Sequence, residues 1–354
     1  MTISETNMTI SGSSPLRLPA EWEPQSAVIM AWPHRLTDWA PTLEDARKCF
    51  GDIVKAVSAE TPVILIAPEG ECSRSVADAG FDSGRVKVVD IPTNDTWVRD
   101  FGPITLADSE GRLVCLDFKF NGWGLKFASN LDNLINRGLV AQGLLPGEYA
   151  NRLNFVLEGG SIESDGMGTI LTTSECLLSP NRNGQWSREE IEQYLCLTLG
   201  AERVLWLDHG ALAGDDTDSH IDTLARFADS ETIVYCGPGE YGDPNNAGLE
   251  AMREQLAGFR RADGLPYNLV ELPLPEPVFD TDGMQLPATY ANFLISNSKV
   301  FVPVYNQPRK DELAVMTLQS VFHDREIVPV DCRALIVQHG SLHCVTMQIP
   351  KIEK

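Results

Sequence analysis

Residues 231–259, ETIVYCGPGEYGDPNNAGLEAMREQLAGF, contain the pattern that decides the fold. The first part is a run of β-branched and other apolar residues that ends in a turn containing Gly237 and Pro238, as expected for a buried strand. In residues 245–259 apolar side chains stand three and four positions apart, which is typical of an amphipathic helix. The segment therefore predicts a strand followed by a helix, the unit of an α/β fold.

The same order recurs along the chain. Apolar runs that end in Pro- or Asn-containing turns also occupy residues 61–71, 169–183 and 298–308. Helical spacing predicts four further helices, at residues 42–60, 128–145, 186–199 and 310–322. Short extended runs follow three of the helices, at residues 61–67, 202–208 and 325–331. Five helices on the order of 60 residues apart, each between strands, indicate a repeated unit that packs against its neighbours, whereas an ordinary α/β sandwich is the alternative.

The bulk composition narrows the classes of protein. The chain has 354 residues, 43% of them apolar, and a formal net charge of −22. This charge argues against binding to nucleic-acid phosphate, which needs clustered Lys and Arg, and it favours a cationic ligand. No apolar run approaches the roughly 18 residues that span a bilayer. We therefore expect neither a nucleic-acid partner nor a membrane partner.

The N-terminal segment and the cysteines favour a cytoplasmic protein. Residues 1–15 have no basic region followed by an apolar segment, so they predict a short disordered lead rather than a secretory signal. No stretch rich in Pro, Gly and Ser divides the rest, so residues 16–354 are expected to form a single domain. The eight cysteines are scattered, with no CxxC pair, which favours reduced thiols in a cytosol.

Four segments combine ionisable residues with Gly in a way that core packing does not require. They are NDTWVRDFGP (94–103), LEGGSIES (157–164), DDTDSHIDTLARF (215–227) and QHGSLHCVTMQIP (338–350). In the first, Trp97 and Asp100 offer an aromatic wall and an anion, which together suit a planar cation. The alternative is a structural ion pair between Arg99 and Asp100 beside a core aromatic residue.

The second and third segments hold further carboxylates and a histidine. Glu158 before Gly159 predicts a carboxylate at the end of a strand, with a tight turn as the alternative. If the third segment is extended, His220 and Asp222 point to the same face and can act as a general base with its carboxylate partner. The other carboxylates of this segment are expected to form a solvated acidic loop: Asp215, Asp216 and Asp218.

Cys344 in the fourth segment allows three interpretations. It is a buried strand thiol, which is the commonest case, a nucleophile, or a zinc ligand together with His339 and His343. On a strand the two histidines would face one side and Cys344 the other, so the three could not converge without a bulge. Because no CxxC pair supplies further ligands at zinc spacing, we expect no metal.

Together these segments resemble a known family. The chain resembles the agmatine deiminase and bacterial peptidylarginine deiminase-like family of guanidino-group-modifying enzymes over nearly its whole length, in LPAEWEPQSAVIMAWPH, NDTWVRDFGP, FNGWG, LEGGSIESDGMGT, LSPNRN, DSHIDTLARF and GSLHCVTMQIP. The resemblance implies a pentein-like α/β propeller of five ββαβ units around a pseudo-fivefold axis, with the active site in the central channel. It also implies a reaction that needs neither a metal nor an organic cofactor.

The resemblance assigns roles to individual residues as well. Cys344 matches the family's nucleophile, and His220 matches its acid/base residue. Asp100 and Asp222 match the carboxylates that hold the guanidinium group, and Glu158 matches an acidic residue near the histidine. We expect four further residues to contact the substrate: Trp97, Asp95, Gly159 and Trp123.

Two stretches differ from a typical agmatine deiminase. After EGGSI, where His-Val-Asp-Gly is common, the chain has ESDG at residues 163–166. Before Cys344, where three glycines and Asn-Ile-His are common, it has QHGSLH at residues 338–343. These differences bear on the part of the substrate that lies beyond the guanidino group.

The resemblance and the chemistry of these residues imply hydrolytic deimination of a small cationic guanidino substrate. Agmatine, giving N-carbamoylputrescine and ammonia through an amidino-cysteine intermediate, is favoured because it has two positive charges and no carboxylate. Alternatives are peptidylarginine or free arginine, giving citrulline, a metal-dependent hydrolase, and a non-catalytic binder of guanidines or polyamines. Carboxylates near Cys344 should raise the pKa of its thiol, an effect that a protonated His220 or the bound cation would offset. By analogy we expect a homodimer.

Overall fold

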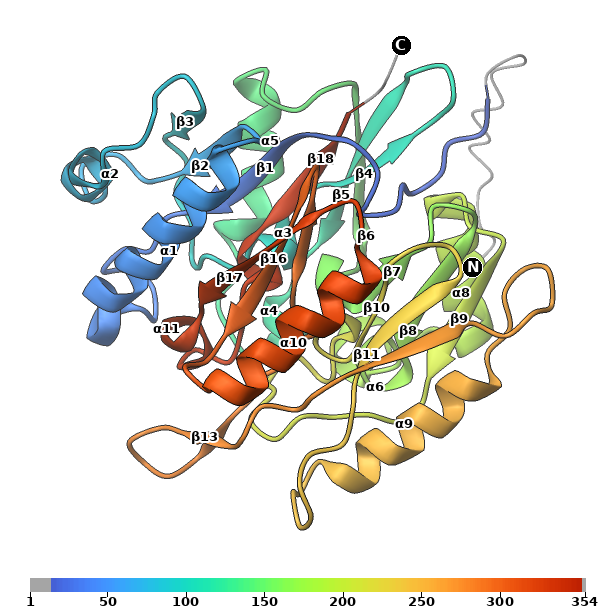
Figure 1. Cartoon of the computed structure of the whole chain (residues 1–354). Helices are drawn as coiled ribbons and strands as arrows, with labels where there is room; N and C mark the ends of the chain where they lie inside the picture. The colour runs from blue at the N-terminus through green and yellow to red at the C-terminus, as the bar shows by residue number, and fades with distance from the viewer. Residues whose placement is uncertain (1–13, 352–354) are drawn as a thin grey trace.

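The computed structural model describes residues 14–351 of the chain (Figure 1). Of the predicted disordered lead, residues 1–15, all but Ser14 and Pro15 lie outside the described residues. The assignment of residues 16–354 to one domain stays a prediction. No helix within residues 14–351 has the length and apolar character that crossing a membrane requires.

The fold is mixed α/β and consists of five small sheets with the same internal order. Each sheet contains an antiparallel pair of strands: β18 (Met347–Pro350) with β1 (Gln25–Ala31), β4 (Ile104–Ala107) with β5 (Leu113–Lys119), β7 (Ile162–Ser164) with β8 (Thr169–Thr173), β10 (Ala225–Phe227) with β11 (Thr232–Cys236), and β15 (Leu294–Ser296) with β16 (Lys299–Val304). The second strand of each pair is followed by a parallel partner: β2 (Val63–Ile66), β6 (Glu148–Val156), β9 (Arg203–Leu207), β12 (Asn268–Leu272) and β17 (Glu326–Asp331).

One main helix lies on each parallel crossover. These helices are α1 (Leu43–Ser58), α5 (Ile135–Ala141), α8 (Arg188–Leu199), α9 (Asn246–Gly258) and α10 (Pro308–Val321). In Figure 1 α1 lies at the left of the view and α9 at the bottom, and α10 crosses in front of the strands. The first sheet gains a fourth strand, β3 (Val86–Val89), after the helix α2 (Ser73–Ala79), and β13 (Val278–Phe279) forms a separate hairpin with β14 (Gln285–Leu286).

The helices predicted from apolar spacing are confirmed, with one of them shorter than expected. The segment 128–145 contains a 3₁₀ turn, η2 (Asp132–Leu134), and then only the seven residues of α5. Helix α8 starts with the capping box of Ser187 and Glu190 and ends at Gly200 in the left-handed conformation. An ordinary α/β sandwich is excluded, because the strands of residues 14–351 form several small sheets that are not joined by hydrogen bonds.

A short polar turn precedes the first strand of every sheet. Four of these turns are α3 (Val98–Phe101), η3 (Gly159–Ser161), η4 (Ile221–Thr223) and η5 (His343–Val345), and the fifth contains Asn292. The turn α3 contacts both η3 and η5, and η3 contacts η4. The pairing of β18 with β1 brings η5, from the end of the chain, to α3 near its beginning. The repeated path of the chain therefore gathers these turns in one place.

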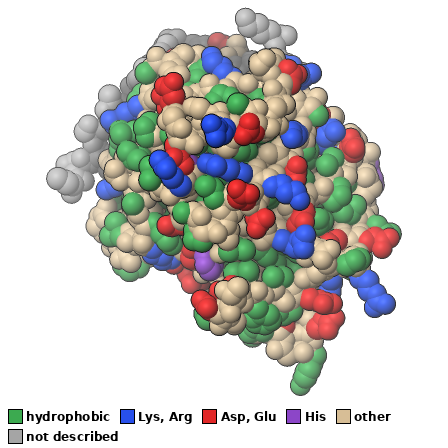
Figure 2. Space-filling view, turned by 90° about the vertical axis from the view of Figure 1, so that its left-hand side faces the viewer, with side chains coloured by type: hydrophobic (Ala, Val, Ile, Leu, Met, Phe, Trp, Pro, Cys, Tyr) green, Lys and Arg blue, Asp and Glu red, His purple; other side chains and the backbone are tan. Residues whose placement is uncertain are grey.

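The surface carries both signs of charge despite the net charge of −22. On the face shown in Figure 2, Lys and Arg side chains are interspersed with Asp and Glu side chains. Acidic side chains therefore separate the positive side chains on this face. A cluster of buried ionisable side chains lies instead at the gathered turns.

Candidate active site

Four ionisable residues from three turns meet around Gly160. Cys344 Sγ lies 3.8 Å from Asp222 Oδ2, and His220 Nδ1 lies 3.6 Å from Asp100 Oδ1. A Cβ atom placed on Gly160 would lie 2.7 Å from His220 Nδ1, 2.8 Å from Asp100 Oδ1 and 3.0 Å from Asp222 Oδ2. All four side chains are buried. The missing side chain of Gly160 therefore leaves a small polar space bounded by an imidazole and two carboxyl groups, with the thiol beside one of them.

His220 and Asp222 do not lie on a strand, so the extended arrangement considered from the sequence does not apply to them. His220 is the N-cap residue of η4, and Asp222 lies inside this 3₁₀ turn. The turn closes through hydrogen bonds from Thr223 N and Thr223 Oγ1 to the carbonyl oxygen of His220, at 3.2 and 2.8 Å. Both side chains still reach Gly160, but it is the tight turn that brings them there.

Cys344 is not on a strand either. It lies in η5, and strand β18 begins only at Met347. The alternation that placed His343 and Cys344 on opposite faces was therefore wrong, because both contact Asp222 Oδ2, at 2.7 and 3.8 Å. The thiol also lies 3.4 Å from the side-chain oxygen of Asn292, a residue that the sequence did not single out.

The potential metal ligands do not support a zinc site at Cys344. His339 lies away from the thiol, with Nδ1 donating to the carbonyl oxygen of Gly214 at 2.7 Å. In residues 14–351 the one cluster with ligand spacing is Glu158, Cys176 and His220. Glu158 in that cluster is already held by the Arg182 guanidinium, whose Nε is 2.9 Å from both carboxylate oxygens.

A cavity whose empty space is about 380 Å³, counted together with its open mouth, leads to the thiol. Asp100 and Cys344 lie among its lining residues, with the aromatic side chains of Trp97, Trp123 and Phe127. Trp123 Nε1 donates to Asp100 Oδ2 at 2.9 Å, and the backbone N–H of Gly160 donates to Asp100 Oδ1 at 3.0 Å. The carboxyl group is thus fixed from two sides. The remaining lining residues are Asp38, Asp95, Asp216, Thr217, Gln338, His339 and Gly340.

Trp97 and Asp95, which the sequence predicts as substrate contacts, line this cavity. The Trp97 ring covers Gly340 so closely that a Cβ atom there would come within 2.2 Å of the ring. Asp95 accepts a hydrogen bond from Thr96 N at 2.8 Å. Burial, together with the nearby Asp132, raises the pKa of Asp95 to about 8. Asp95 is therefore a wall residue that holds a proton more firmly than an ordinary carboxyl group.

Glu158 and Gly159, also predicted as substrate contacts, are not among the residues that line this cavity. Glu158 is fully buried against Arg182, within 4.8 Å of ligand atoms of His220 and Cys176. Gly159 lines a second cavity on the other side of the turns. Glu158 therefore lies behind the imidazole of His220, and the glycine that borders the polar space is Gly160.

The acidic loop of the third segment is structured, so the expectation of a solvated loop was wrong. Asp218 pairs with Arg182 at 2.5 Å and with Lys126 at 2.6 Å. Asp215 accepts a hydrogen bond from Ser219 N at 2.7 Å. Burial raises the pKa of Asp216 to about 6. The loop forms part of the cavity mouth through Asp216 and Thr217.

Burial and neighbouring charges determine which groups of the site carry a proton when no ligand is bound. Burial by itself lowers the pKa of His220, but Asp100, Cys176 and Glu158 raise it well above its usual value. Burial raises the pKa of the Cys344 thiol well above its usual value, and Asp222 and Asp100 add to this effect. Burial also raises the pKa of Asp100 to about 6, with His220 opposing it. Without a ligand, these shifts favour an imidazolium at His220 and a neutral thiol at Cys344.

Several residues of the site had no distinct signal in the sequence. Asn292 belongs to TYANFLIS, a segment without an obvious motif, yet it precedes β15 as Cys344 precedes β18. An alignment of the five repeats on their first strands would have pointed to it. Arg182 lies in LSPNRN, and Cys176 lies in the apolar run at residues 169–183. Their contacts with Glu158 come from the tertiary structure.

Comparisons with known proteins agree over the full length of the chain. The model of the Porphyromonas-type peptidyl-arginine deiminase family matches residues 17–350. The agmatine deiminase of Stutzerimonas stutzeri is 35% identical, over 94% of this chain and 95% of that protein. A substrate-bound cysteine-to-serine variant of C. jejuni agmatine deiminase is 37% identical with a TM-score of 0.88, covering 98% of this chain and all of that one.

A structure provisionally named a peptidyl-arginine deiminase is 44% identical, with a TM-score of 0.90, over 96% of this chain and 99% of that one. The matches therefore extend through every turn that contributes to the cavity. On this evidence the chain belongs to the Porphyromonas-type peptidyl-arginine deiminase family.

Proposed function

We propose that the protein hydrolyses a guanidino group, and that its substrate is agmatine, converted to N-carbamoylputrescine and ammonia. The observation that carries this proposal is the meeting of a thiol, an imidazole and two carboxyl groups around the bare face of Gly160. Membership of the family makes the chain a hydrolase of C–N bonds. The related proteins named agmatine deiminase support the choice of substrate.

The two carboxyl groups suit a guanidinium group in both charge and shape. A guanidinium is planar and protonated near neutral pH, with its N–H groups directed to its edges. Asp100 and Asp222 lie on two sides of the space beside Gly160 and would each accept from one edge. Trp123 and the Gly160 N–H fix the orientation of Asp100, so the plane of the substrate is set before the reaction.

In the first stage Cys344 Sγ forms a bond to the guanidinium carbon. The cation between Asp100 and Asp222 offsets the negative charges that raise the pKa of the thiol, so binding favours the thiolate, and the thiol proton is released to solvent. The imidazolium of His220 gives its proton to one nitrogen of the tetrahedral intermediate. The C–N bond then breaks, ammonia leaves, and an amidino-thioether remains on Cys344.

In the second stage water replaces the enzyme sulfur. His220, now neutral, takes a proton from a water molecule, and the oxygen attacks the amidino carbon. As the C–S bond breaks, the departing sulfur takes the proton of the new hydroxyl group, so the thiol is restored and the neutral ureido product leaves. Glu158, held by Arg182 behind His220, stabilises the imidazolium that the two stages require.

The cavity mouth favours agmatine over arginine. Its carboxyl groups come from Asp38, Asp95 and Asp216, and no Lys or Arg is among the described residues that line the cavity. The α-carboxylate of free arginine would meet acidic side chains without a cationic partner, whereas the second ammonium group of agmatine would be attracted. Peptidylarginine is the second candidate, because of the 44% identity to the structure provisionally given that activity.

An ammonia-release assay with agmatine, free arginine and a blocked peptidylarginine tests the substrate directly. We expect the largest kcat/KM with agmatine, and no loss of activity on treatment with a chelator. A preference for the blocked peptide would replace agmatine by peptidylarginine. Binding of agmatine without ammonia release would support a non-catalytic binder, and loss of activity with the chelator would support a metal-dependent hydrolase.

We also propose that the five repeated sheets surround a pseudo-fivefold axis with the cavity at its centre. The identical order of strands in the sheets and the contacts between their entry turns support this arrangement. A homodimer and a cytoplasmic location stay predictions.

A further inference from the structure

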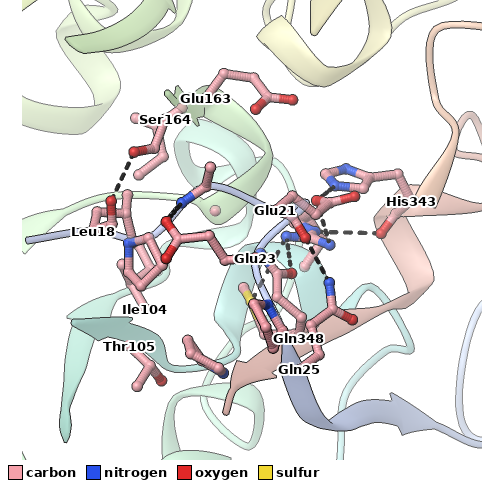
Figure 3. A pocket seen from close by; sticks show the side chains of 18 residues that line it. Leu18, Glu21, Glu23, Gln25, Ile104, Thr105, Glu163, Ser164, His343 and Gln348 are labelled. Carbon is pink, nitrogen blue, oxygen red and sulfur yellow. Dashed lines mark hydrogen bonds and ion pairs between the residues drawn. The ribbon is translucent and has the colours of Figure 1, made fainter. Parts of the chain in front are cut away.

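A second cavity, whose empty space is about 630 Å³ when its open mouth is counted, lies behind the turns of the candidate active site (Figure 3). Neighbouring residues of the same turns face the two cavities. Asp100 and Cys344 line the first cavity, whereas Arg99 and His343 line the second. Figure 3 shows Glu21, from the segment before β1, beside the His343 ring. The mechanism above uses the first face and leaves this buried cluster without a function.

His343 connects the two faces through its ring nitrogens. Nδ1 lies 2.7 Å from Asp222 Oδ2, the same oxygen that lies 3.8 Å from the Cys344 thiol. On the other side of the ring, Nε2 lies 2.6 Å from Glu21 Oε2. The guanidinium of Arg226, on β10, lies 3.1 Å from Nε2 and 3.0 Å from Glu21 Oε2. These side chains are buried.

The two short contacts require two protons. A neutral imidazole has one N–H group and can donate to only one carboxylate. Two oxygens at these distances therefore need one proton between Nε2 and Glu21 and another between Nδ1 and Asp222. Burial by itself raises the pKa of Glu21, but His343, Arg226 and Arg99 hold it well below its usual value. Glu21 is thus a carboxylate, and the proton of that contact lies on Nε2, so Nε2 does not accept from Arg226, whose Nη2 pairs instead with Glu21 Oε2 at 3.0 Å.

The charge balance of the cluster supports the second proton. The cluster contains three carboxyl groups, those of Glu21, Glu163 and Asp222, and two guanidinium groups. Arg226 pairs with both Glu21 and Glu163, and Arg99 lies 3.6 Å from Glu21. One further proton, shared by His343 and Asp222, makes this buried group neutral, as a medium of low dielectric constant requires.

We propose that His343 is a positioning residue that holds Asp222 and takes up the shared proton when a guanidinium binds. In the empty site, burial and the charges of Arg226 and Arg99 lower the pKa of His343, while Glu21 and Asp222 oppose this effect. A guanidinium that uses Asp222 Oδ2 as its acceptor competes with the proton in the 2.7 Å contact, so that proton moves to Nδ1 of His343 and is not released to solvent.

This proposal rests on the proposed function, and it can be tested without turnover. In the Cys344→Ala protein with ¹⁵N-labelled histidine, added agmatine should leave both ring nitrogens of His343 protonated in the NMR spectrum. One unprotonated ring nitrogen with agmatine bound would overturn the proposal for His343 alone. Failure of this variant to bind agmatine at all would overturn both the proposed function and the proposal.

Substitutions separate proton uptake from support of the fold. His343→Asn retains an N–H donor for Asp222 but has no basic nitrogen, so the acid limb of kcat/KM should move up by about one pH unit, a tenfold loss on that limb. His343→Leu removes the donor as well and should raise KM further. The control His323→Asn, at an exposed histidine, should change neither parameter. An unchanged pH profile in a folded His343→Asn protein would contradict the proposal.

Discussion

At the scale of single residues, Gly160 defines the site by having no side chain. The space beside its Cα is bounded by His220, Asp100 and Asp222, all within 3.0 Å of where a Cβ atom would be. The sequence signalled a glycine pair at 159–160 but did not reveal which of the two borders the active site. That distinction depends on the direction of the chain in η3, because Gly159 faces the second cavity.

We predict that Gly160→Ala strongly weakens substrate binding and leaves the fold intact. The new methyl group would occupy the position of the guanidinium and press on polar atoms at 2.7 to 3.0 Å. KM should rise by more than tenfold, as measured by ammonia release, with a circular dichroism spectrum like that of the parent. The matched control is Gly51→Ala, where the nearest atom is 3.8 Å away. Equal activity of both variants would be evidence against the site.

Asp100 should give the reaction an acid limit. Its pKa is raised to about 6, chiefly by burial, so it takes up a proton below that pH in the free protein and loses its attraction for the cation. We predict that kcat/KM falls about tenfold per pH unit below about pH 6, since this parameter reports groups of the free enzyme. A profile that stays flat down to pH 5 would show that a different group holds the guanidinium.

At the scale of elements, the sequence predicted the regular structure better than the turns. Apolar spacing located α1, α8, α9 and α10, because each of these helices buries one face against its sheet. The turns η4 and η5 were assigned to strands instead. The polar residues of each turn lie close together in the sequence. The turns, however, are stabilised by tertiary contacts, such as the hydrogen bond of 2.9 Å from His343 N to Asn292 Oδ1, and no local sequence pattern reveals such contacts.

The loop before η5 should control which substrate tail enters. His339 has φ +65°, a conformation that favours glycine, and its ring holds the loop to Gly214 beside Asp216. We predict that His339→Gly keeps or raises the melting temperature, because it relieves backbone strain. The variant also lacks the ring that holds the loop to Gly214, so the cavity mouth should open. The ratio of kcat/KM for agmatine to kcat/KM for arginine should then fall about tenfold.

The ratio of kcat/KM values for the two compounds measures this effect. Asn306→Gly is the control, because Asn306 also has a positive φ, +59°, but does not line the cavity. If both variants showed the parent's ratio, the mouth would not select the tail through His339.

At the scale of the whole molecule, the repeat of five sheets could be predicted from the spacing of helices, and the closure of the chain could not. The pairing of β18 with β1 joins residues that are more than three hundred positions apart, and only this pairing brings Cys344 to Asp100 and Asp222. Sequence reasoning reached these four residues through resemblance to a family. Their distances follow from packing of the sheets.

Buried carboxyl groups should make the stability of the fold fall as pH rises. The pKa of Asp95 is raised from 3.8 to about 8, and that of Asp132 to about 7, both mainly by burial. A folded state with raised pKa values binds more protons than the unfolded chain between these limits, so unfolding becomes easier as the groups ionise. We predict a melting temperature several degrees lower at pH 9 than at pH 6.

Asp95→Asn should reduce this difference, because an amide keeps the shape of the group and cannot ionise. Asp52→Asn, at an exposed position, should retain the full difference. A melting temperature that rises with pH in the parent protein would contradict the predicted direction.

The most direct test of the central claim is the mass of the protein after rapid acid quench during turnover of agmatine. If Cys344 attacks the guanidinium carbon, peptide mapping will show an adduct on residue 344 equal to agmatine less one ammonia, and Cys344→Ala will show neither adduct nor ammonia. Sustained ammonia release by Cys344→Ala, or an adduct on any other residue, would contradict it.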